Sequence, residues 1–311
     1  MSFEADPAAR LDWIALDWGT TNMRAWAMVG DRPVASASLA KGMAGLAPDD
    51  YEGALIEAVG HWLPAGRVTD IVACGMVGSR QGWVEAGYEA VPCPPHRAVP
   101  MARAPSRDPR IAVHVIHGLK QTVPADVMRG EETQLAGLVA SRPEFDGVAC
   151  LPGTHAKWVT IEHGIVKRFA TFMTGELFAL LAGQSVLRHT VSETGWNDAA
   201  FTDAVVEALR SPLAAFQGLF GIRAGALLDR LDPASARARL SGLLIGSEIA
   251  AARPLWEGSS IALIGAEATS RHYARALAVA GASADLLDVT AMTLDGLVAA
   301  HRQLQSSRVH P

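Results

Sequence analysis

A short polar turn between two apolar runs is the first stretch of the chain whose residues suit chemistry. It carries Asp17, Gly19, Thr20, Thr21 and Asn22, and its flanks read as the two strands of a β-hairpin. Hydroxyl and backbone N–H groups at such a tip donate to phosphate oxygens, and glycine leaves the approach open. We expect a positive φ at Gly19, which Asn22 also tolerates. Asp17 suits a hydrated Mg²⁺; the alternative is an ordinary threonine-rich hairpin.

A second turn of the same kind follows an apolar strand in the other half of the chain. Gly153, Thr154 and His155 form its tip, and Lys157 lies on the next strand. Two such hairpins facing each other across a cleft would hold a polyphosphate from both sides. Phosphoryl transfer further needs a metal ion, charge neutralisation and a base. The pair of turns predicts a nucleotide-dependent kinase, although the repeat is too short to establish duplication. An exposed strand lysine is the alternative for Lys157.

A glycine-rich loop at 75–83 carries side chains suited to an acidic, hydroxylated ligand. Arg80 is able to pair with a carboxylate in two hydrogen bonds, and Ser79 and Gln81 are able to bind hydroxyls beside Gly78. A surface ion pair is the alternative for Arg80. Arg24, just after the first turn, joins these residues as a candidate for substrate binding.

A strand followed by glycine and a helix occurs near the end of the chain. Residues 261–264 are apolar, and Gly265 leaves room for a flat ring at the start of the next helix. The alternative is a plain turn in which glycine serves packing. The similar stretch at 243–248 is also compatible with a helix that has a glycine at a crossing point.

Periodicity predicts the elements that must position these residues. The first half is expected to form strands at 13–16, 23–29, 34–39, 70–74 and 111–116, and helices at 49–62 and 125–140. The second half is expected to form strands at 148–151, 156–161, 165–172, 261–264 and 286–287, and helices at 178–187, 199–209, 216–231, 235–251, 268–280 and 293–305. The proline-rich segment 92–109 is expected to be a surface loop. We expect an α/β fold of two lobes, 1–120 and 121–311, with the boundary near 118–126.

Composition excludes several classes of protein. The chain has 311 residues, 50% of them apolar, and a net charge of −5, without a run of lysine or arginine. Nucleic acid and anionic membranes are therefore poor partners. No secretory signal and no membrane-length apolar segment is expected, so we expect a cytoplasmic protein. The cysteines Cys74, Cys93 and Cys150 are expected to be reduced. Cys93 and His96 have the spacing of half a zinc site, but no second half exists.

Six segments together resemble one kinase family. They read D-W-G-T-T-N, C-G-M-V-G-S-R-Q-G-W, R-G-E-E-T-Q, P-G-T-H-A-K-W, M-T-G-E-L-F and G-L-L-I-G-S-E, and they fall between about Trp13 and Thr293. They are similar to the 2-dehydro-3-deoxygalactonokinase family of the sugar-kinase/actin/Hsp70 superfamily. The resemblance implies two ribonuclease-H-like lobes with a central cleft, and ATP- and Mg²⁺-dependent phosphorylation of the 6-hydroxyl of 2-dehydro-3-deoxy-D-galactonate.

The resemblance also implies roles for particular residues. Gly265 belongs to the adenosine-binding segment, and a carboxylate in R-G-E-E-T-Q, at residues 129–134, takes the proton of the attacking hydroxyl. Glu131 stands where related kinases often carry Asp, so Glu132 and Asp126 remain alternatives; both glutamates also favour a helix N-terminus. Other functions left open are a kinase for another sugar acid, since nothing in the sequence separates C4 epimers, and a non-catalytic nucleotide-gated clamp. The oligomeric state is also open, and a homodimer is one option.

Overall fold

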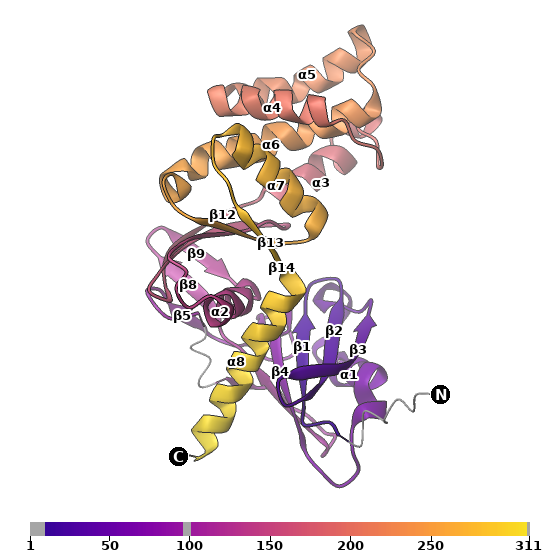
Figure 1. Ribbon diagram of the computed structural model, residues 1–311. Helices are drawn as coiled ribbons and strands as arrows, with labels where there is room; N and C mark the ends of the chain where they lie inside the picture. The colour runs from indigo at the N-terminus through magenta and orange to yellow at the C-terminus, as the bar shows by residue number, and fades with distance from the viewer. Residues whose placement is uncertain (1–9, 96–100, 310–311) are drawn as a thin grey trace, which may run out of the picture. The chain divides into compact units, whose positions relative to one another are not determined.

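The computed structural model describes residues 10–95 and 101–309, and the chain divides into two compact units (Figure 1). The first unit comprises Met1–Phe145, His163–Val166 and Thr290–Pro311, and the second comprises Asp146–Glu162 and Lys167–Val289. This division differs from a split at residue 120. The helix after residue 130 and the last helix both contact the N-terminal sheet. Both helices therefore belong to the first unit.

The first unit is built on a six-stranded sheet of order β3-β2-β1-β4-β7-β6. Its strands are β1 (Trp13–Trp18), β2 (Met23–Val29), β3 (Arg32–Leu39), β4 (Thr69–Gly75), β6 (Ala102–Arg103) and β7 (Ile111–Val115). β1 pairs antiparallel with β2 and parallel with β4. One face of β1 is covered by α1 (Tyr51–Val59), where Leu16 and Leu55 share one core. The expected strands at 13–16, 23–29, 34–39 and 70–74 and the helix between the last two are present.

Two helices lie against each other on the other side of this unit. α2 (Glu131–Ser141) and α8 (Val289–Val309) approach so closely that a Cβ on Gly137 would lie 1.9 Å from the Met292 carbonyl oxygen. A Cβ on Gly296 would lie equally close to the Thr133 carbonyl oxygen. α8 also stacks His301 on Trp13 of β1, with ring centroids 4.1 Å apart. The last helix therefore belongs to the N-terminal core.

One expected helix is wrong in its first turn. Residues 125–140 read as helical, but Ala125–Met128 is strand β9, which pairs antiparallel with β8 (Gly118–Thr122) in a small sheet with β5 (Tyr88–Ala90). The helix begins only at Glu131 because Gly130 has a φ of +105°, which interrupts helical backbone. Within the proline-rich segment, the short strand β6 was also not expected, and residues 96–100, including His96, lie outside the described residues.

The second unit repeats the strand order of the first. Its sheet has the order β12-β11-β10-β13-β14 and comprises β10 (Gly147–Leu151), β11 (Ala156–Glu162), β12 (Ile165–Phe172), β13 (Ile261–Gly265) and β14 (Asp285–Asp288). As in the first unit, an antiparallel hairpin precedes a strand that joins in parallel, here β13 beside β10. The shared order indicates that the two Gly-Thr turns occupy equivalent places in two related sheets.

Five helices complete the second unit. They are α3 (Thr174–Gln184), α4 (Asp198–Arg210), α5 (Ala214–Leu228), α6 (Pro233–Trp256) and α7 (Glu267–Val279). α6 is the long central helix, and α4 and α5 both pack against it (Figure 1). The closeness of α4 and α6 depends on glycine, since a Cβ on Gly242 would lie 2.5 Å from the Phe201 carbonyl oxygen. The glycine at 246 likewise lies at a helix crossing, as the alternative interpretation of 243–248 expected.

Candidate functional site

The first Gly-Thr turn forms an exposed tip that is tied to the following loop. The Gly19 N–H donates to the Asn22 carbonyl oxygen at 2.9 Å, and the N–H groups of Met43 and Ala44 donate to the carbonyl oxygens of Gly19 and Thr20. The positive φ expected at Gly19 is wrong, and the turn closes without a left-handed residue. The side chains of Thr20 and Thr21 remain exposed to solvent, as phosphate binding at this tip requires.

Asp17 lies at the end of β1 in a polar cluster below this tip. Its Oδ2 lies 2.6 Å from the Arg24 guanidinium, and its Oδ1 lies 3.8 Å from the Cys74 thiol. Arg24 also donates to the Thr290 hydroxyl at 3.2 Å. Burial raises the pKa of the Cys74 thiol, and the nearby Asp17 and Glu132 carboxyls add to this effect. Cys74 is therefore a neutral neighbour of Asp17 and not a nucleophile.

Two left-handed glycines bring the start of α2 to the same place. Gly75, at the end of β4, has a φ of +91°, and its Cβ would lie 3.4 Å from the Asp17 Oδ1. Gly130 has a φ of +105°, and its Cβ would lie 3.4 Å from the Gly75 Cα. A Cβ on Gly75 would also lie 2.7 Å from the Trp18 carbonyl oxygen, and the left-handed φ of both glycines would strain any other residue. The glycines thus hold Asp17 and the two glutamates at 131–132 in one neighbourhood within the first unit.

The three carboxylates proposed as the base have different surroundings. Glu132 is 1% exposed, and its oxygens accept from the Gly130 N–H at 2.7 Å and the Thr133 hydroxyl at 3.2 Å. Burial, followed by the charge of Glu131, raises the pKa of Glu132 to about 8. Glu131 is partly exposed and accepts from the Arg129 N–H at 3.0 Å. Asp126 lies in strand β9, where it accepts from its neighbour Val127, and not at the helix start.

The loop at 75–83 folds tightly after β4. A Cβ on Gly82 would lie 2.2 Å from the Val77 carbonyl oxygen, and Gly78 and Ser79 are buried. Gln81 is exposed, and the Arg80 side chain is 80% exposed, with its Nε 3.5 Å from Glu85. The structure therefore directs Arg80 to solvent and not to the Asp17 neighbourhood.

A different arginine, which sequence reasoning did not single out, lies beneath this loop. Arg129 donates to the Ala86 carbonyl oxygen at 2.6 Å, and its guanidinium lies 4.3 Å from the centroid of the Tyr88 ring. Its Nη1 would be 2.8 Å from a Cβ on Gly78. The string R-G-E-E-T-Q contained this residue, but only the packing shows that it connects the loop to the helix that carries the glutamates.

The second Gly-Thr turn lies at the start of α3. A Cβ on Gly175 would lie 2.3 Å from the Gly153 carbonyl oxygen, and the Glu176 N–H donates to the Thr154 carbonyl oxygen at 2.9 Å. His155 Nε2 lies 2.5 Å from a Glu176 carboxylate oxygen. Lys157 is buried and donates to the His155 carbonyl oxygen at 3.1 Å, so it supports the tip from below and is not an exposed strand lysine.

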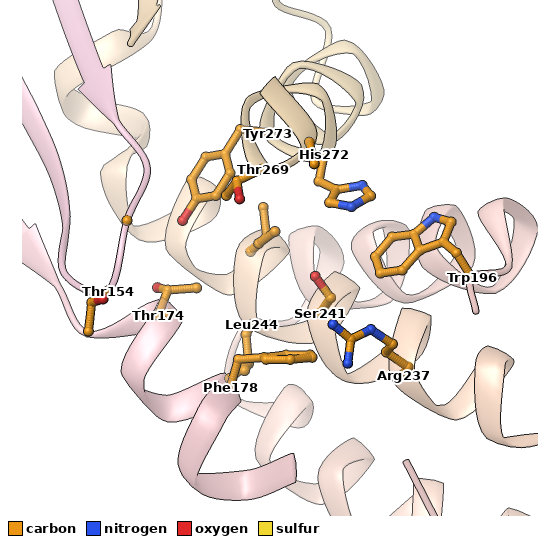
Figure 2. Close-up of a pocket in the computed structure, with 14 residues that line it drawn as sticks. Thr154, Thr174, Phe178, Trp196, Arg237, Ser241, Leu244, Thr269, His272 and Tyr273 are labelled. Carbon is orange, nitrogen blue, oxygen red and sulfur yellow. The ribbon is translucent and has the colours of Figure 1, made fainter. Parts of the chain in front are cut away.

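A cavity of about 440 Å³ opens beside this turn, within the second unit (Figure 2). Trp196 and His272 stack at one end, with ring centroids 3.9 Å apart, and the Arg237 guanidinium lies 5.1 Å from the centroid of the Phe178 ring. Figure 2 shows Trp196, His272 and Arg237 at one end of the cavity, Thr154 with Thr174 at the other, and Phe178 between them. Burial lowers the pKa of His272 and so favours its neutral ring. Such a cavity suits a flat aromatic ring at one end and phosphate at the other.

Gly265 connects this cavity to the sheet. At the end of β13, its Cβ would lie 3.0 Å from the Pro152 carbonyl oxygen and 3.1 Å from the Ser270 hydroxyl. The glycine thus allows β13 to lie against the second turn and α7 to begin beside it. α7 then supplies Thr269, His272 and Tyr273 to the cavity. Sequence reasoning found this segment but missed Trp196, Arg237 and His272, because no local motif contains them.

A buried carboxylate supports the same cavity. Glu248 of α6 accepts from the Tyr273 hydroxyl and from the Trp158 indole N–H, both at 2.7 Å. Burial raises the pKa of Glu248. Glu248 therefore holds α6, α7 and β11 together behind the cavity, while Leu244 and Ile245 of the same helix contribute to its lining.

A family model described as 2-keto-3-deoxy-galactonokinase matches residues 17–300. The chain belongs to this family. The 2-keto-3-deoxy-galactonokinase match spans both Gly-Thr turns, the two glutamates and the cavity, so this family member is a carbohydrate kinase, as the six segments predicted.

Two curated relatives and one solved structure agree with this assignment. The chain is 39% identical to a protein of Rhizobium meliloti (strain 1021) named as a probable 2-dehydro-3-deoxygalactonokinase, over 94% of this chain and 97% of the relative. It is 33% identical to the 2-dehydro-3-deoxygalactonokinase of Escherichia coli (strain K12), over 91% and 93% of the two chains. The crystal structure of a family member from Sinorhizobium meliloti superposes with a TM-score of 0.87 at 37% identity, covering 94% and 96%.

A more distant structure shows the fold alone. The activator of 2-hydroxyisocaproyl-CoA dehydratase from Clostridium difficile superposes with a TM-score of 0.54 at 12% identity, covering 96% of this chain and 97% of the activator. The expected actin-like ATPase fold is thereby confirmed for this 2-keto-3-deoxy-galactonokinase family member. None of its described helices is long and apolar enough to cross a membrane, and its described residues contain no group of three or more metal-ligating side chains.

Proposed function

We propose that this chain transfers the γ-phosphoryl group of ATP to the 6-hydroxyl of 2-dehydro-3-deoxy-D-galactonate, in the cytoplasm. Family membership and the names of the relatives support the substrate. The observation that carries the mechanism is the packing of Gly130 on Gly75, which brings the start of α2 to Asp17. Phosphoryl transfer needs a metal ion that neutralises charge and a base for the attacking hydroxyl. This arrangement provides one carboxylate for the metal ion and another for the base.

ATP is proposed to bind in the cavity of the second unit. Adenine would stack at the Trp196 end, where the rings are flat and burial favours a neutral imidazole. The phosphates would extend toward Gly153 and Thr154, whose hydroxyl and N–H groups suit phosphate oxygens. His155 stands at the same tip, and Gly265 keeps the strand end close enough to form the cavity wall.

Asp17 is proposed to bind Mg²⁺ through water. Mg²⁺ is ordinarily held by one or two carboxylates together with substrate phosphates and water, so a single partly exposed carboxylate fits it. The ion would neutralise charge on the transferring group. Gly19, Thr20, Thr21 and Asn22 are proposed to bind phosphate at the tip above it.

Glu131 is proposed as the general base. The 6-hydroxyl oxygen attacks the γ-phosphorus, the bond to the bridging oxygen of ADP breaks, and the hydroxyl proton passes to Glu131. Glu132 is less suited because it is buried and keeps its proton up to about pH 8. Glu132 is instead proposed to fix the Gly130 backbone, whose N–H it accepts.

The sugar acid is proposed to bind near the loop that follows β4. Gly78, Ser79, Arg80, Gln81 and Arg24 remain the candidates for contact with it. Because Arg80 points to solvent, its use requires that the loop or the side chain turns toward the ligand when the acid binds.

A coupled assay of ADP production tests the proposal. A panel of 2-dehydro-3-deoxy aldonates that includes the galactonate and gluconate epimers is supplied, and phosphorus NMR locates the phosphate on the product. We expect the galactonate epimer to give the highest kcat/KM and the product to be a 6-phosphate. A preference for another aldonate would support the second kinase function, and ADP release that is independent of any sugar acid would support a nucleotide-gated clamp.

A further inference from the structure

The outer helix of the second unit has an apolar stripe on each of two sides. One stripe of α5 faces inward, where Ala215 and Ile222 are buried. The other contains Leu213, Phe216, Phe220 and Leu227, spaced by three, four and seven residues, and all four are exposed. A helix that is apolar all round is ordinarily buried. α5 lies at the outside of its unit (Figure 1), so its second stripe has no cover within the described residues of the second unit.

The exposed apolar area is large enough for a stable interface. Leu213, Phe216, Phe220, Leu227 and Leu228 are 84%, 76%, 67%, 65% and 80% exposed. At on the order of 200 Å² for each large side chain, they present roughly 700 Å² of apolar surface. The largest apolar patch on a typical monomer is about 300–600 Å². A standard interface buries about 800 Å² on each partner, so this surface is close to that size before any neighbouring residues are added.

A groove beside the stripe makes the surface complementary to itself. A cavity of about 460 Å³ lies between α3, α5 and α6, and Leu177, Leu181, Phe216 and Leu219 contribute to its apolar lining. Each chain thus carries the projecting Phe rings of α5 and, beside them, an apolar hollow between α3, α5 and α6. An interface with two-fold symmetry needs this combination, because each copy supplies both the projecting and the receiving surface.

Charge on this surface also favours a second copy over a charged partner. Arg223 is the single charged residue of α5, and it donates to the Thr190 hydroxyl at 3.1 Å. α3 has one charged residue, Glu176, which lies next to His155. Depletion of charge at an apolar centre is typical of homodimer interfaces.

We propose that a second copy of this chain covers the outer face of α5, with the two helices related by a two-fold axis near Phe220. The stripe runs from Leu213 to Leu227, so its midpoint lies at Phe220. An antiparallel pair would therefore place each Phe220 near its symmetry mate and each Leu213 near the partner's Leu227.

Sedimentation velocity of the full chain at about 10 μM tests the proposal. We expect the wild type to sediment as a dimer and Phe220→Asp to raise the dissociation constant at least ~100-fold, whereas Val68→Asp, at an exposed valine of the first unit, stays dimeric. Circular dichroism confirms that both variants fold. A monomeric wild type, or a Phe220→Asp variant that stays dimeric, would overturn the proposal.

A cross-linking experiment tests the axis itself. A Cβ on Gly221 would meet no atom within 4 Å, and the natural cysteines at 74, 93 and 150 are buried. Mild oxidation should therefore link two copies of Gly221→Cys through a disulfide, while Gly53→Cys, at an exposed and equally open position on α1, should not link. Equal linking of both variants would refute the placement. Flotation of a monomeric wild type with phosphatidylglycerol vesicles, lost in Phe220→Asp, would assign the face to a lipid surface and overturn the dimer.

Discussion

The guanidinium of Arg24 lies 2.6 Å from the carboxylate of Asp17, and the two residues are directly paired between β2 and β1. The register of the first hairpin therefore decides that the carboxylate proposed for Mg²⁺ has a cation beside it. Arg24 also reaches Thr290 at the start of α8, so the pair connects the hairpin to the last helix of the same unit. We expect Mg²⁺-ATP to replace part of this contact when it binds.

Asp17→Asn should lower kcat by on the order of 10²-fold or more, because the variant loses the charge that would organise Mg²⁺ at the transferring phosphoryl group. Binding of the sugar acid should change little. Steady-state kinetics over a range of Mg²⁺ concentrations measure the effect. Asp49→Asn, at an exposed carboxylate of the same unit, is the control. Near-normal kcat at saturating Mg²⁺-ATP would exclude the metal role.

Glu131→Gln should lower kcat by ~10²–10⁴-fold, the usual consequence of removing a general base. The KM for ATP should change little. Glu132→Gln should lower kcat much less, because Glu132 is buried and hydrogen-bonded to Gly130. Rapid-quench measurement of the chemical step compares the two variants. If the order of the effects is reversed, Glu132 is the base; if both effects are mild, Asp126 becomes the candidate.

Glu132 should make stability depend on pH between about 4.5 and 8. The folded protein keeps the Glu132 proton up to about pH 8, because burial raises this pKa. The unfolded chain releases the proton near pH 4.5, so it binds fewer protons in this interval, and the free energy of unfolding falls as the pH rises. The Glu132→Gln variant has no carboxyl group to titrate at this position, so it lacks this fall in the free energy of unfolding. Its Tm relative to wild type should therefore increase by several degrees between pH 5 and pH 8.

Differential scanning calorimetry at several pH values measures this difference. Glu144→Gln, at an exposed carboxylate of the same unit, should keep the wild-type pH dependence. A difference between Glu132→Gln and wild type that stays constant from pH 5 to pH 8 would contradict the buried, protonated state of Glu132.

Trp196→Ala should raise the KM for ATP by about 10-fold or more, since stacking of a base on an aromatic ring contributes ~1–3 kcal/mol. Trp196 forms the flat end of the cavity with His272, so Trp196→Phe should preserve most of the affinity. Isothermal titration with ADP measures binding without turnover. Unchanged ADP affinity in Trp196→Ala would place the nucleobase elsewhere.

Arg80→Lys should raise the KM for the sugar acid by about 10-fold or more, because lysine keeps the charge but loses the bidentate geometry. ATP affinity without the sugar acid should stay the same. The control is Arg67→Lys, at another arginine of the same unit. The Arg80 side chain is 80% exposed in this structure. An unchanged KM for the sugar acid would mean that Arg80 stays in solvent and does not contact the substrate.

The sequence by itself determined the features that depend on local chemistry. The two Gly-Thr turns, the order of strands around them, and the strand–glycine–helix at Gly265 all follow from apolar periodicity interrupted by glycine. These signals need only neighbouring residues, and the structure has each of them at the expected place. The family resemblance rested on the same short segments, and it was confirmed.

The tertiary structure decided which residues meet. Strand β9 replaced the expected first turn of a helix because pairing with β8 and the left-handed Gly130 outweigh the helical pattern of residues 125–128. Trp196, Arg237 and His272 come from a loop and two different helices, so no local motif joins them. The different surroundings of Glu131 and Glu132 likewise follow from packing on Gly75, since burial, and not sequence position, raises the pKa of one of two adjacent identical side chains.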